Sequence, residues 1–84
     1  MLSNLATRDV ETLLHPYTNL SAHRQTGPLV LERGEGVHVY DTEGRSYIEG
    51  MSGLWCTALG YSNAELVEAA RAQMARLPFT HLFS

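Results

Sequence analysis

The chain has 84 residues, of which 44 % are hydrophobic and 18 % are charged, and its net charge is −3. A chain of this length provides one small domain, and its mild acidity gives no support for nucleic acid or an anionic membrane as a partner. No apolar run approaches the roughly 20 residues that span a bilayer. The single cysteine excludes an internal disulfide, and the first residues do not resemble a signal peptide, so we expect a cytoplasmic protein.

All six basic residues are arginines, and the chain contains no lysine. Enzymes that form a Schiff base use the amine of a lysine for that bond. These 84 residues therefore cannot complete Schiff-base chemistry by themselves.

A short amphipathic helix is predicted at residues 7–14. Thr7 can cap its start, and Pro16 cannot continue a helix because it has no N–H group. Residues 15–28 are polar and irregular, with Tyr17 as a large side chain among them, so we expect an extended connection there.

From residue 29 the apolar period changes to two, which predicts a three-stranded antiparallel β-meander over residues 29–49. Asp41 can accept a hydrogen bond from the backbone two residues on, and Gly44 suits a left-handed position that closes the same turn. The strands are expected at residues 29–32, 37–40 and 45–49. Together with the flanking helices, this meander predicts an α+β fold.

A glycine-rich loop of residues 50–61 follows the meander. It contains Trp55 and Cys56, which are the only tryptophan and the only cysteine of the chain. Long connections inside compact domains are usually functional or disordered, and large apolar side chains argue against disorder. We therefore expect this loop to line a binding site.

A second helix is predicted at residues 63–77. Ser62 and Glu65 have the spacing of a capping box, and Pro78 prevents continuation. The apolar stripe of this helix consists of Leu66, Ala70, Met74 and Leu77. Residues 79–84 are apolar and aromatic without a terminating signal, so either a partner covers them or the chain has been cut there.

Few residue patterns in the chain indicate catalysis, and no residue is predicted to be catalytic. Cys56 has no histidine nearby in sequence, which favours a small packed residue over a nucleophile. Glu49 and Asp41 lie at a strand end and in a turn, where solvated or capping roles are expected. No metal site is expected, because no two histidines have the spacing of a ligand pair. The histidines are His15, His23, His38 and His81.

Trp55 has two interpretations that the residue types leave open. It can be a core tryptophan that anchors the loop on the meander, or it can be a pocket wall that orients a ligand without doing chemistry. Tyr17, Phe79 and Phe83 have the same two interpretations.

The order and spacing of several segments resemble the amino-terminal part of class III aminotransferases, with the ω-amino acid:pyruvate type as the best match. The similarity extends from about residue 15 to residue 83. The segments that carry it are Gly27 to Val37, Val39 to Gly50, Ser52 to Cys56, and Gly60 with Tyr61 before the second helix.

This resemblance implies a pyridoxal-phosphate enzyme of fold type I, and a homodimer whose active sites lie at the subunit interface. Leu54 and Trp55 match substrate-pocket positions, and Tyr17 matches an aromatic residue that closes the same pocket. Phe83 matches an aromatic residue that is contributed to the pocket of the neighbouring subunit. Ser84 falls where some relatives have a second aromatic residue.

The family's Schiff-base lysine, pyridine-binding aspartate, phosphate-binding segment and carboxylate-binding arginine are all expected beyond Ser84. The resemblance therefore implies an amino-terminal fragment that is inactive alone and needs the remainder of the enzyme chain. In the complete enzyme, an amine or ω-amino acid would pass its amino group to the cofactor, and an oxo acid such as pyruvate would take it away. The identity of the amine donor is left open.

Two alternatives belong to other functional classes. A non-catalytic meander-and-helix module, which binds a protein through the Trp55 loop and residues 79–83, agrees with the missing lysine. A small ligand-binding domain, with Trp55 and Tyr17 as stacking platforms, agrees less well because no convergent polar groups accompany them.

Overall fold

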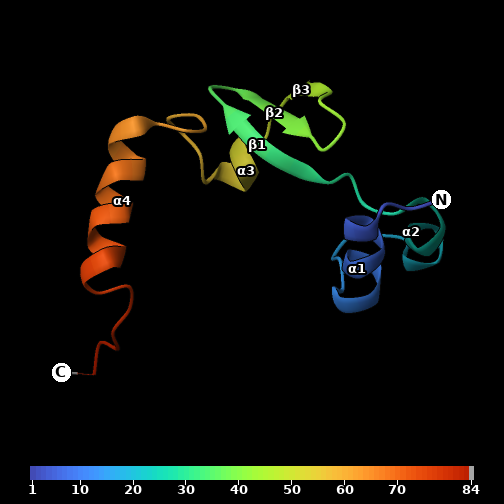
Figure 1. The fold of residues 1–84 in the computed structure, drawn as a ribbon, viewed down its shortest axis with the longest axis horizontal. Helices are drawn as coiled ribbons and strands as arrows, with labels where there is room; N and C mark the ends of the chain where they lie inside the picture. Colours follow the sequence, from blue (N-terminus) through green and yellow to red (C-terminus); the bar gives the residue numbers. More distant parts are fainter. Residues whose placement is uncertain (84) are drawn as a thin grey trace.

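The computed structural model describes residues 1–83 and confirms the predicted α+β class (Figure 1). Helical elements flank a three-stranded sheet on both sides along the chain. In chain order, the elements are α1 (Asn4–Thr12), α2 (Leu20–Thr26), β1 (Leu31–Glu35), β2 (His38–Asp41), β3 (Ser46–Ile48), α3 (Ser52–Trp55) and α4 (Ala64–Arg76).

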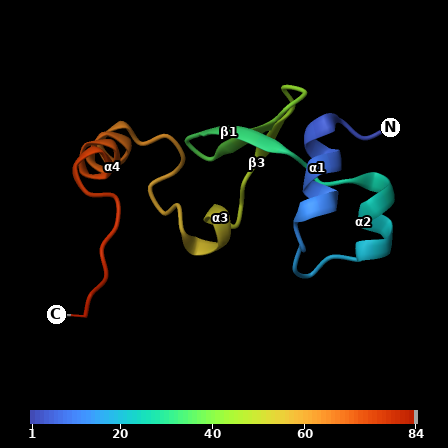
Figure 2. The same cartoon turned by 60° about the horizontal axis from the view of Figure 1, so that its bottom comes forward.

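The elements form an open arch (Figures 1 and 2). Helices α1 and α2 lie side by side at one end, the sheet spans the middle, and α4 with the following tail forms the other end. The radius of gyration is 16.4 Å, whereas a compact domain of this length has about 12 Å. Within residues 1–83, the buried hydrophobic residues are only Ala6 and Val39. The arch therefore has almost no hydrophobic core of its own.

Helix α1 begins earlier than the sequence predicts, so the proposed cap at Thr7 is wrong. The hydroxyl of Ser3 accepts a hydrogen bond from the backbone N–H of Ala6 at 3.2 Å, which makes Ser3 the N-cap. The helix ends at Thr12 because Leu13 is already extended, with φ −115° and ψ 136°. Pro16 therefore lies beyond a helix that has already ended.

Helix α2 corrects the expectation of an extended connection over residues 15–28. Asn19 caps its start by accepting a hydrogen bond from the N–H of Ala22 at 3.1 Å. Gly27 ends the helix with φ 71°, a conformation that glycine adopts without steric cost. The helix has only seven residues, too few to show a clear apolar period, although both of its end signals are present in the sequence.

The three strands form the predicted antiparallel meander in the order β1-β2-β3. Strand β1 begins and ends later than the predicted residues 29–32. It continues through Gly34 to Glu35, which pairs with His38. The connecting turn is thus reduced to Gly36 and Val37. Burial alternates along β2, as expected for a strand with one covered face.

The turn between β2 and β3 is closed by Asp41, whose side chain is buried. Its Oδ1 atom accepts hydrogen bonds from the backbone N–H groups of Glu43 and Arg45, both at 2.9 Å. Its Oδ2 atom accepts from the Nε of Arg45 at 2.7 Å and the hydroxyl of Tyr47 at 2.9 Å. Burial by itself raises the pKa of Asp41, but the hydrogen bonds from Arg45, Tyr47 and Glu43 outweigh it and lower that pKa to about 2. The capping role predicted for Asp41 is confirmed.

Helix α4 lies within one residue of its predicted bounds at each end, but its cap differs from the prediction. Asn63 is the N-cap and accepts a hydrogen bond from the N–H of Leu66 at 3.2 Å. Ser62 instead has φ 59°, and its hydroxyl donates to the carbonyl oxygen of Gly34. The predicted capping box is therefore wrong, because Ser62 faces the sheet and not the helix start.

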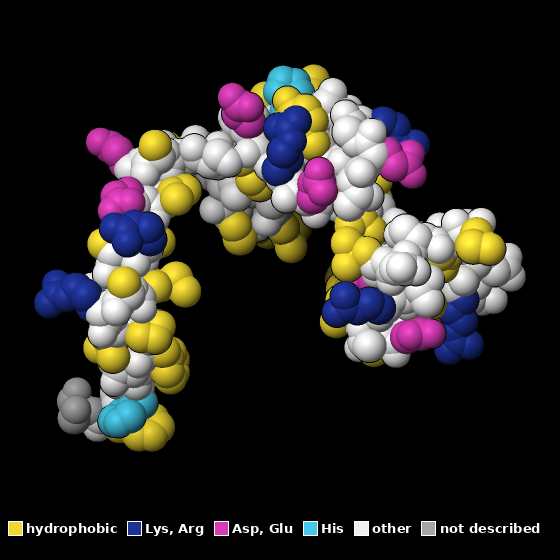
Figure 3. Space-filling model, in the orientation of Figure 1, with side chains coloured by type: hydrophobic (Ala, Val, Ile, Leu, Met, Phe, Trp, Pro, Cys, Tyr) yellow, Lys and Arg dark blue, Asp and Glu magenta, His cyan; other side chains and the backbone are white. Residues whose placement is uncertain are grey.

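The predicted apolar stripe of α4 has no partner surface within the described residues, since the helix contains no buried residue. Figure 3 shows hydrophobic side chains gathered along the side of α4 that faces the concavity of the arch. Amphipathic helices gain most of their stability from packing such a face. None of the helices within residues 1–83 has the length and apolar character needed to cross a membrane.

Candidate functional site

The loop between β3 and α4 contains a left-handed turn at its centre. Four consecutive residues, Ser52 to Trp55, have positive φ angles between 51° and 69°. The backbone N–H of Trp55 donates to the carbonyl of Met51 at 2.9 Å, which closes one helical turn. Element α3 is therefore a single turn of left-handed helix.

This turn is conformationally costly, because only Gly53 lacks a Cβ atom. A left-handed conformation costs about 1–2 kcal/mol for each non-glycine residue. Ser52, Leu54 and Trp55 all adopt it. Strained backbone of this kind is found mainly at binding and catalytic sites, where the surrounding structure enforces it. The geometry thus marks residues 52–55 as a candidate functional site.

Glu49 holds the left-handed turn in place. Its carboxylate accepts hydrogen bonds from the backbone N–H groups of Met51, at 3.0 Å, and Gly53. The hydroxyl of Tyr61 also donates to this carboxylate, at 3.1 Å. The bond from the Gly53 N–H is the main cause that lowers the pKa of Glu49, and it outweighs the opposing effect of burial. The capping role predicted for Glu49 is confirmed.

Tyr61 anchors the other end of the loop on the β1–β2 hairpin. Its backbone exchanges two hydrogen bonds with Gly36, at 2.8 and 3.1 Å. Its ring lies over Gly34, where an added Cβ atom would approach the ring carbon Cγ to 2.6 Å. The glycine at position 34 therefore makes room for the aromatic ring. The hairpin and Glu49 together fix both ends of the loop.

Leu54 and Trp55 project from this supported turn. The side chain of Trp55 is 85 % exposed, so it is not a core tryptophan within residues 1–83. Cys56 is also exposed, which corrects the expectation of a packed residue, and its thiol lies 3.5 Å from the carbonyl oxygen of Leu54. Within the part of the chain that the structure describes, Trp55 presents a free aromatic face.

Tyr17 and Phe83, the other two predicted pocket residues, are also exposed, but they lie on distant segments. Tyr17 has φ 49° in the connection between α1 and α2, and Phe83 belongs to the tail after α4. These two segments occupy opposite ends of the arch (Figure 1). The described chain therefore does not bring the four predicted residues into one pocket. Ser84, named above as a second-aromatic position, lies outside the described residues.

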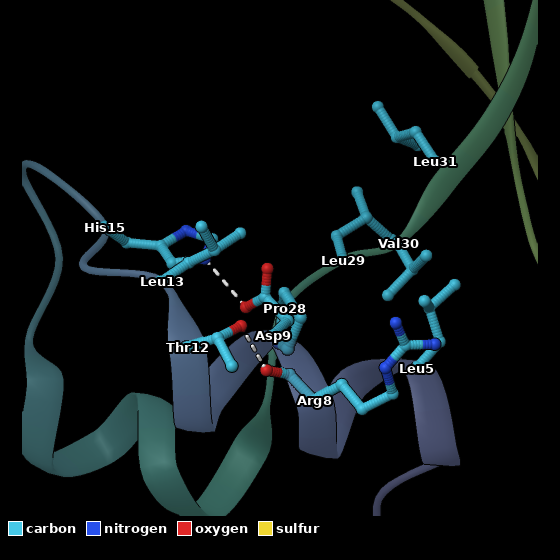
Figure 4. A pocket seen from close by; sticks show the side chains of 10 residues that line it. All are labelled: Leu5, Arg8, Asp9, Thr12, Leu13, His15, Pro28, Leu29, Val30 and Leu31. Atoms are coloured by element: carbon cyan, nitrogen blue, oxygen red, sulfur yellow. Dashed lines mark hydrogen bonds and ion pairs between the residues drawn. The ribbon is translucent and has the colours of Figure 1, made fainter.

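Two cavities of the described chain lie elsewhere, beside α1. One has a volume of about 440 Å³ and opens between α1 and the segment that enters β1 (Figure 4). A second, of about 600 Å³, lies between the start of α1 and the turn around Asp41. The first is lined by Leu5, Arg8, Asp9, Thr12, Leu13, His15, Pro28, Leu29, Val30 and Leu31.

A polar cluster at the edge of the first cavity was not anticipated from the sequence. The Nε2 atom of His15 lies 2.7 Å from Oδ2 of Asp9, and the Nε2 atom of His23 lies 3.4 Å from the same oxygen. The spacing of the histidines along the chain predicted no metal site. These three residues lie six to fourteen positions apart and meet because α1 and α2 fold side by side, which local spacing does not reveal.

The family model described as aminotransferase class-III matches residues 20–83. The chain is 48 % identical over 71 residues to γ-aminobutyrate transaminase 1, mitochondrial, of Solanum lycopersicum, and covers 14 % of that protein with 84 % of its own length. It is 38 % identical over 87 residues to the putrescine–pyruvate aminotransferase of Pseudomonas aeruginosa, covering 19 % of that protein and 98 % of itself.

Solved structures give the same result. The omega transaminase of Pseudomonas jessenii in complex with PMP is 55 % identical, with a TM-score of 0.87 over 98 % of this chain and 18 % of that one. The (S)-enantioselective omega transaminase of Thermomicrobium roseum is 51 % identical, with a TM-score of 0.86 over 94 % of this chain and 18 % of that one.

The comparisons support the aminotransferase prediction and give no support to the interaction module or the ligand-binding domain. Across the two named curated relatives, the chain spans 14 % to 19 % of their length. The match covers the sheet, the Trp55 loop and α4 in one continuous stretch. This chain belongs to the class III aminotransferase family.

Proposed function

We propose that this chain is the amino-terminal part of a pyridoxal-phosphate-dependent aminotransferase. The reaction is transfer of an amino group from an amine or ω-amino acid to an oxo acid such as pyruvate. The observation that carries this proposal is the family match over residues 20–83. The named relatives, a γ-aminobutyrate transaminase and a putrescine–pyruvate aminotransferase, support the same class of reaction.

This chain by itself does not supply the lysine that a pyridoxal-phosphate site requires. Pyridoxal phosphate supplies an electron sink when it is held by a lysine Schiff base, and these 84 residues contain no lysine. The lysine that holds the cofactor therefore belongs to the remainder of the enzyme. The proposed role of this chain is to shape the substrate cavity and exclude water from it.

Trp55 and Leu54 form one wall of the substrate pocket in this proposal. The supported left-handed turn presents Trp55, which is 85 % exposed, where its ring can meet a ligand. A further comparison supports this role. An omega transaminase variant engineered for the asymmetric synthesis of enantiopure bulky amines carries substitutions at a tryptophan and a phenylalanine that are 28 positions apart. Trp55 and Phe83 have the same separation of 28 positions.

Tyr17 and Phe83 of one chain contribute to the pockets of two different subunits in this proposal. Tyr17 closes the pocket of its own subunit, and Phe83 enters the pocket of a second subunit in a homodimer. The positions of their segments at opposite ends of the arch agree with contributions to two different pockets. The exposed apolar side of α4 supports burial against the rest of the enzyme or its partner.

The proposed compartment is the cytoplasm, on the basis of the single cysteine. The plant relatives are named as mitochondrial proteins. Fractionation of the host cell, with a tagged form of the complete enzyme, distinguishes these two locations.

Replacement of Trp55 by alanine in the complete enzyme tests the proposed pocket. Removing a flat apolar wall changes the transition-state binding of each amine according to its size. We therefore expect the ratio of kcat/KM between large and small amine donors to change by about 10-fold or more, which alters their ranking. Retention of the cofactor should stay within about 2-fold, because Trp55 contributes no group that binds it. The measurements are kcat/KM for amines of increasing size and the cofactor content after dialysis.

A matched control is Val67→Ala, which shortens an exposed apolar side chain on α4. This variant should leave the amine ranking unchanged. Loss of cofactor from Trp55→Ala with an unchanged amine ranking would show that the tryptophan is structural, and the pocket proposal would then be wrong.

A further inference from the structure

Three side chains with metal-binding atoms converge in the α1–α2 hairpin, away from the Trp55 loop. Asp9 comes from α1, His15 from the connection between the helices, and His23 from α2. Their ligand atoms all lie within 4.8 Å of one another. The two imidazole rings have a centroid separation of 4.4 Å. The hairpin therefore places two nitrogen donors around one carboxylate oxygen.

His23 provides independent evidence that the cluster binds something. Its side chain is only 8 % exposed, and its Nε2 atom has no hydrogen-bond partner among the described residues. Nε2 nevertheless points into the cluster, 3.4 Å from Oδ2 of Asp9. A buried polar atom without a partner costs free energy, and such atoms are rare in folded proteins. A bound cation would supply the missing partner.

The donor set and its dimensions suit a divalent transition-metal ion. In zinc sites that keep an open position, the ion is held by three protein ligands from histidine and carboxylate groups, with water in the fourth position. Tetrahedral bonds of about 2.0–2.1 Å place neighbouring ligand atoms roughly 3.3 Å apart. The separation of 3.4 Å between Asp9 and His23 matches this spacing. The contact of 2.7 Å between Asp9 and His15 has to lengthen by about half an ångström for the ion to enter. The ligand atoms of the two histidines, which lie within 4.8 Å of each other, have to take up the same spacing of roughly 3.3 Å.

The cluster is also accessible to an ion and to water. The side chains of His15 and Asp9 are 30 % and 19 % exposed, and both line the cavity beside α1. Figure 4 shows them directed toward one another at the edge of that cavity. A water molecule in the cavity can therefore complete the coordination of the ion.

We propose that Asp9, His15 and His23 form a binding site for a divalent transition-metal ion, with Zn²⁺ as the physiological type. The ion fastens α1 to α2, two helices of nine and seven residues that are too short to be stable alone. This inference does not depend on the proposed aminotransferase function, because none of the three residues belongs to the proposed substrate pocket.

Cobalt titration of the complete, assembled protein tests the site. Co²⁺ replaces Zn²⁺ and gives visible absorption when it is bound by nitrogen and oxygen ligands in a site of low coordination number. We expect one Co²⁺ per copy of this chain, and we expect Zn²⁺ to displace it. His15→Gln should weaken binding by about 100-fold, since even second-shell changes reduce metal affinity by about 10- to 100-fold.

The variants at position 15 separate ligation from folding. His15 is the most exposed of the three ligands, so His15→Gln should leave the hairpin folded, and circular dichroism checks this. His15→Cys supplies a thiolate and should retain Zn²⁺ binding. His38→Gln, which changes a histidine on β2 outside the cluster, should bind like the parent protein. Equal cobalt spectra for His15→Gln and the parent protein, or no cobalt spectrum for the parent protein, would overturn the proposal.

Discussion

The sheet with its Trp55 loop and the helix α4 with its tail are held in different ways. In the first region, residues distant in sequence bind one another: the Tyr61 backbone pairs with Gly36, and the Tyr61 hydroxyl donates to Glu49. In α4, the described hydrogen bonds are local, from the Asn63 cap to the pair of Arg71 with Glu68. Polar contacts can therefore shape a segment that buries little apolar surface, whereas an amphipathic helix requires a partner surface.

This comparison predicts that changes in the sheet and its loop have larger effects than changes at the ends of α4. The test protein is the assembled enzyme, because the described chain buries too little apolar surface to be expected to fold alone. Amide hydrogen exchange reports the stability of each region separately.

Asp41→Ala should have the largest effect. It removes a buried acceptor and leaves two backbone N–H groups and the Tyr47 hydroxyl without their partner. We expect faster amide exchange throughout β2 and β3 and a lower midpoint of urea unfolding. Glu43→Ala is the control, because it removes only an exposed ion pair with Arg45 at 3.2 Å. Equal effects of the two variants would contradict the structural role of Asp41.

The same carboxylate predicts a pH dependence. Its pKa is lowered from 3.8 to about 2 in the folded chain, so the ionised form stabilises folding. This contribution is fully present above about pH 4 and is lost as the pH falls through about 2. Acid titration of the parent protein should therefore loosen the β2–β3 hairpin over this range. Asp41→Asn, which cannot ionise, should not show that component.

Gly34→Ala should have the next largest effect. It should lower the free energy of unfolding by about 1–3 kcal/mol, because the new methyl group overlaps the ring of Tyr61. The loop has to move away from the hairpin, so exchange should increase at the Gly36 and Tyr61 amides. Gly50→Ala is the matched control, since an added Cβ atom there meets no atom within 4 Å. If the two variants were equally stable, the anchoring of the loop by Tyr61 would be refuted.

Asn63→Ala should have the smallest effect. It should lower the free energy of unfolding by about 1 kcal/mol, because it removes one N-cap hydrogen bond. Faster exchange should be limited to the first turn of α4, at Leu66 above all. Ser62→Ala should leave that turn unchanged, since its hydroxyl bonds to Gly34. The opposite pattern would restore the capping box that the sequence suggests.

Much of the fold follows from local patterns in the sequence. The meander was predictable because its apolar period and its turn residues agree, and α4 was predictable because thirteen residues are enough to show a helical stripe. Helix α2 and the start of α1 were not, because seven residues show no clear period and several residues near Ser3 and Thr7 can serve as caps.

The candidate sites also have features that the sequence reveals and features that only the structure reveals. The sequence by itself determined the family and the absence of lysine, and it singled out Trp55 as a candidate, because these depend on residue identity and order. Only the tertiary structure decided that Trp55 stands on a left-handed turn and that Asp9, His15 and His23 meet. Both features depend on contacts between segments that are distant in sequence: Tyr61 pairs with Gly36 and donates to Glu49, and α2 returns alongside α1. Such distances are set by the path of the chain in space, which the spacing of residues along the sequence does not encode.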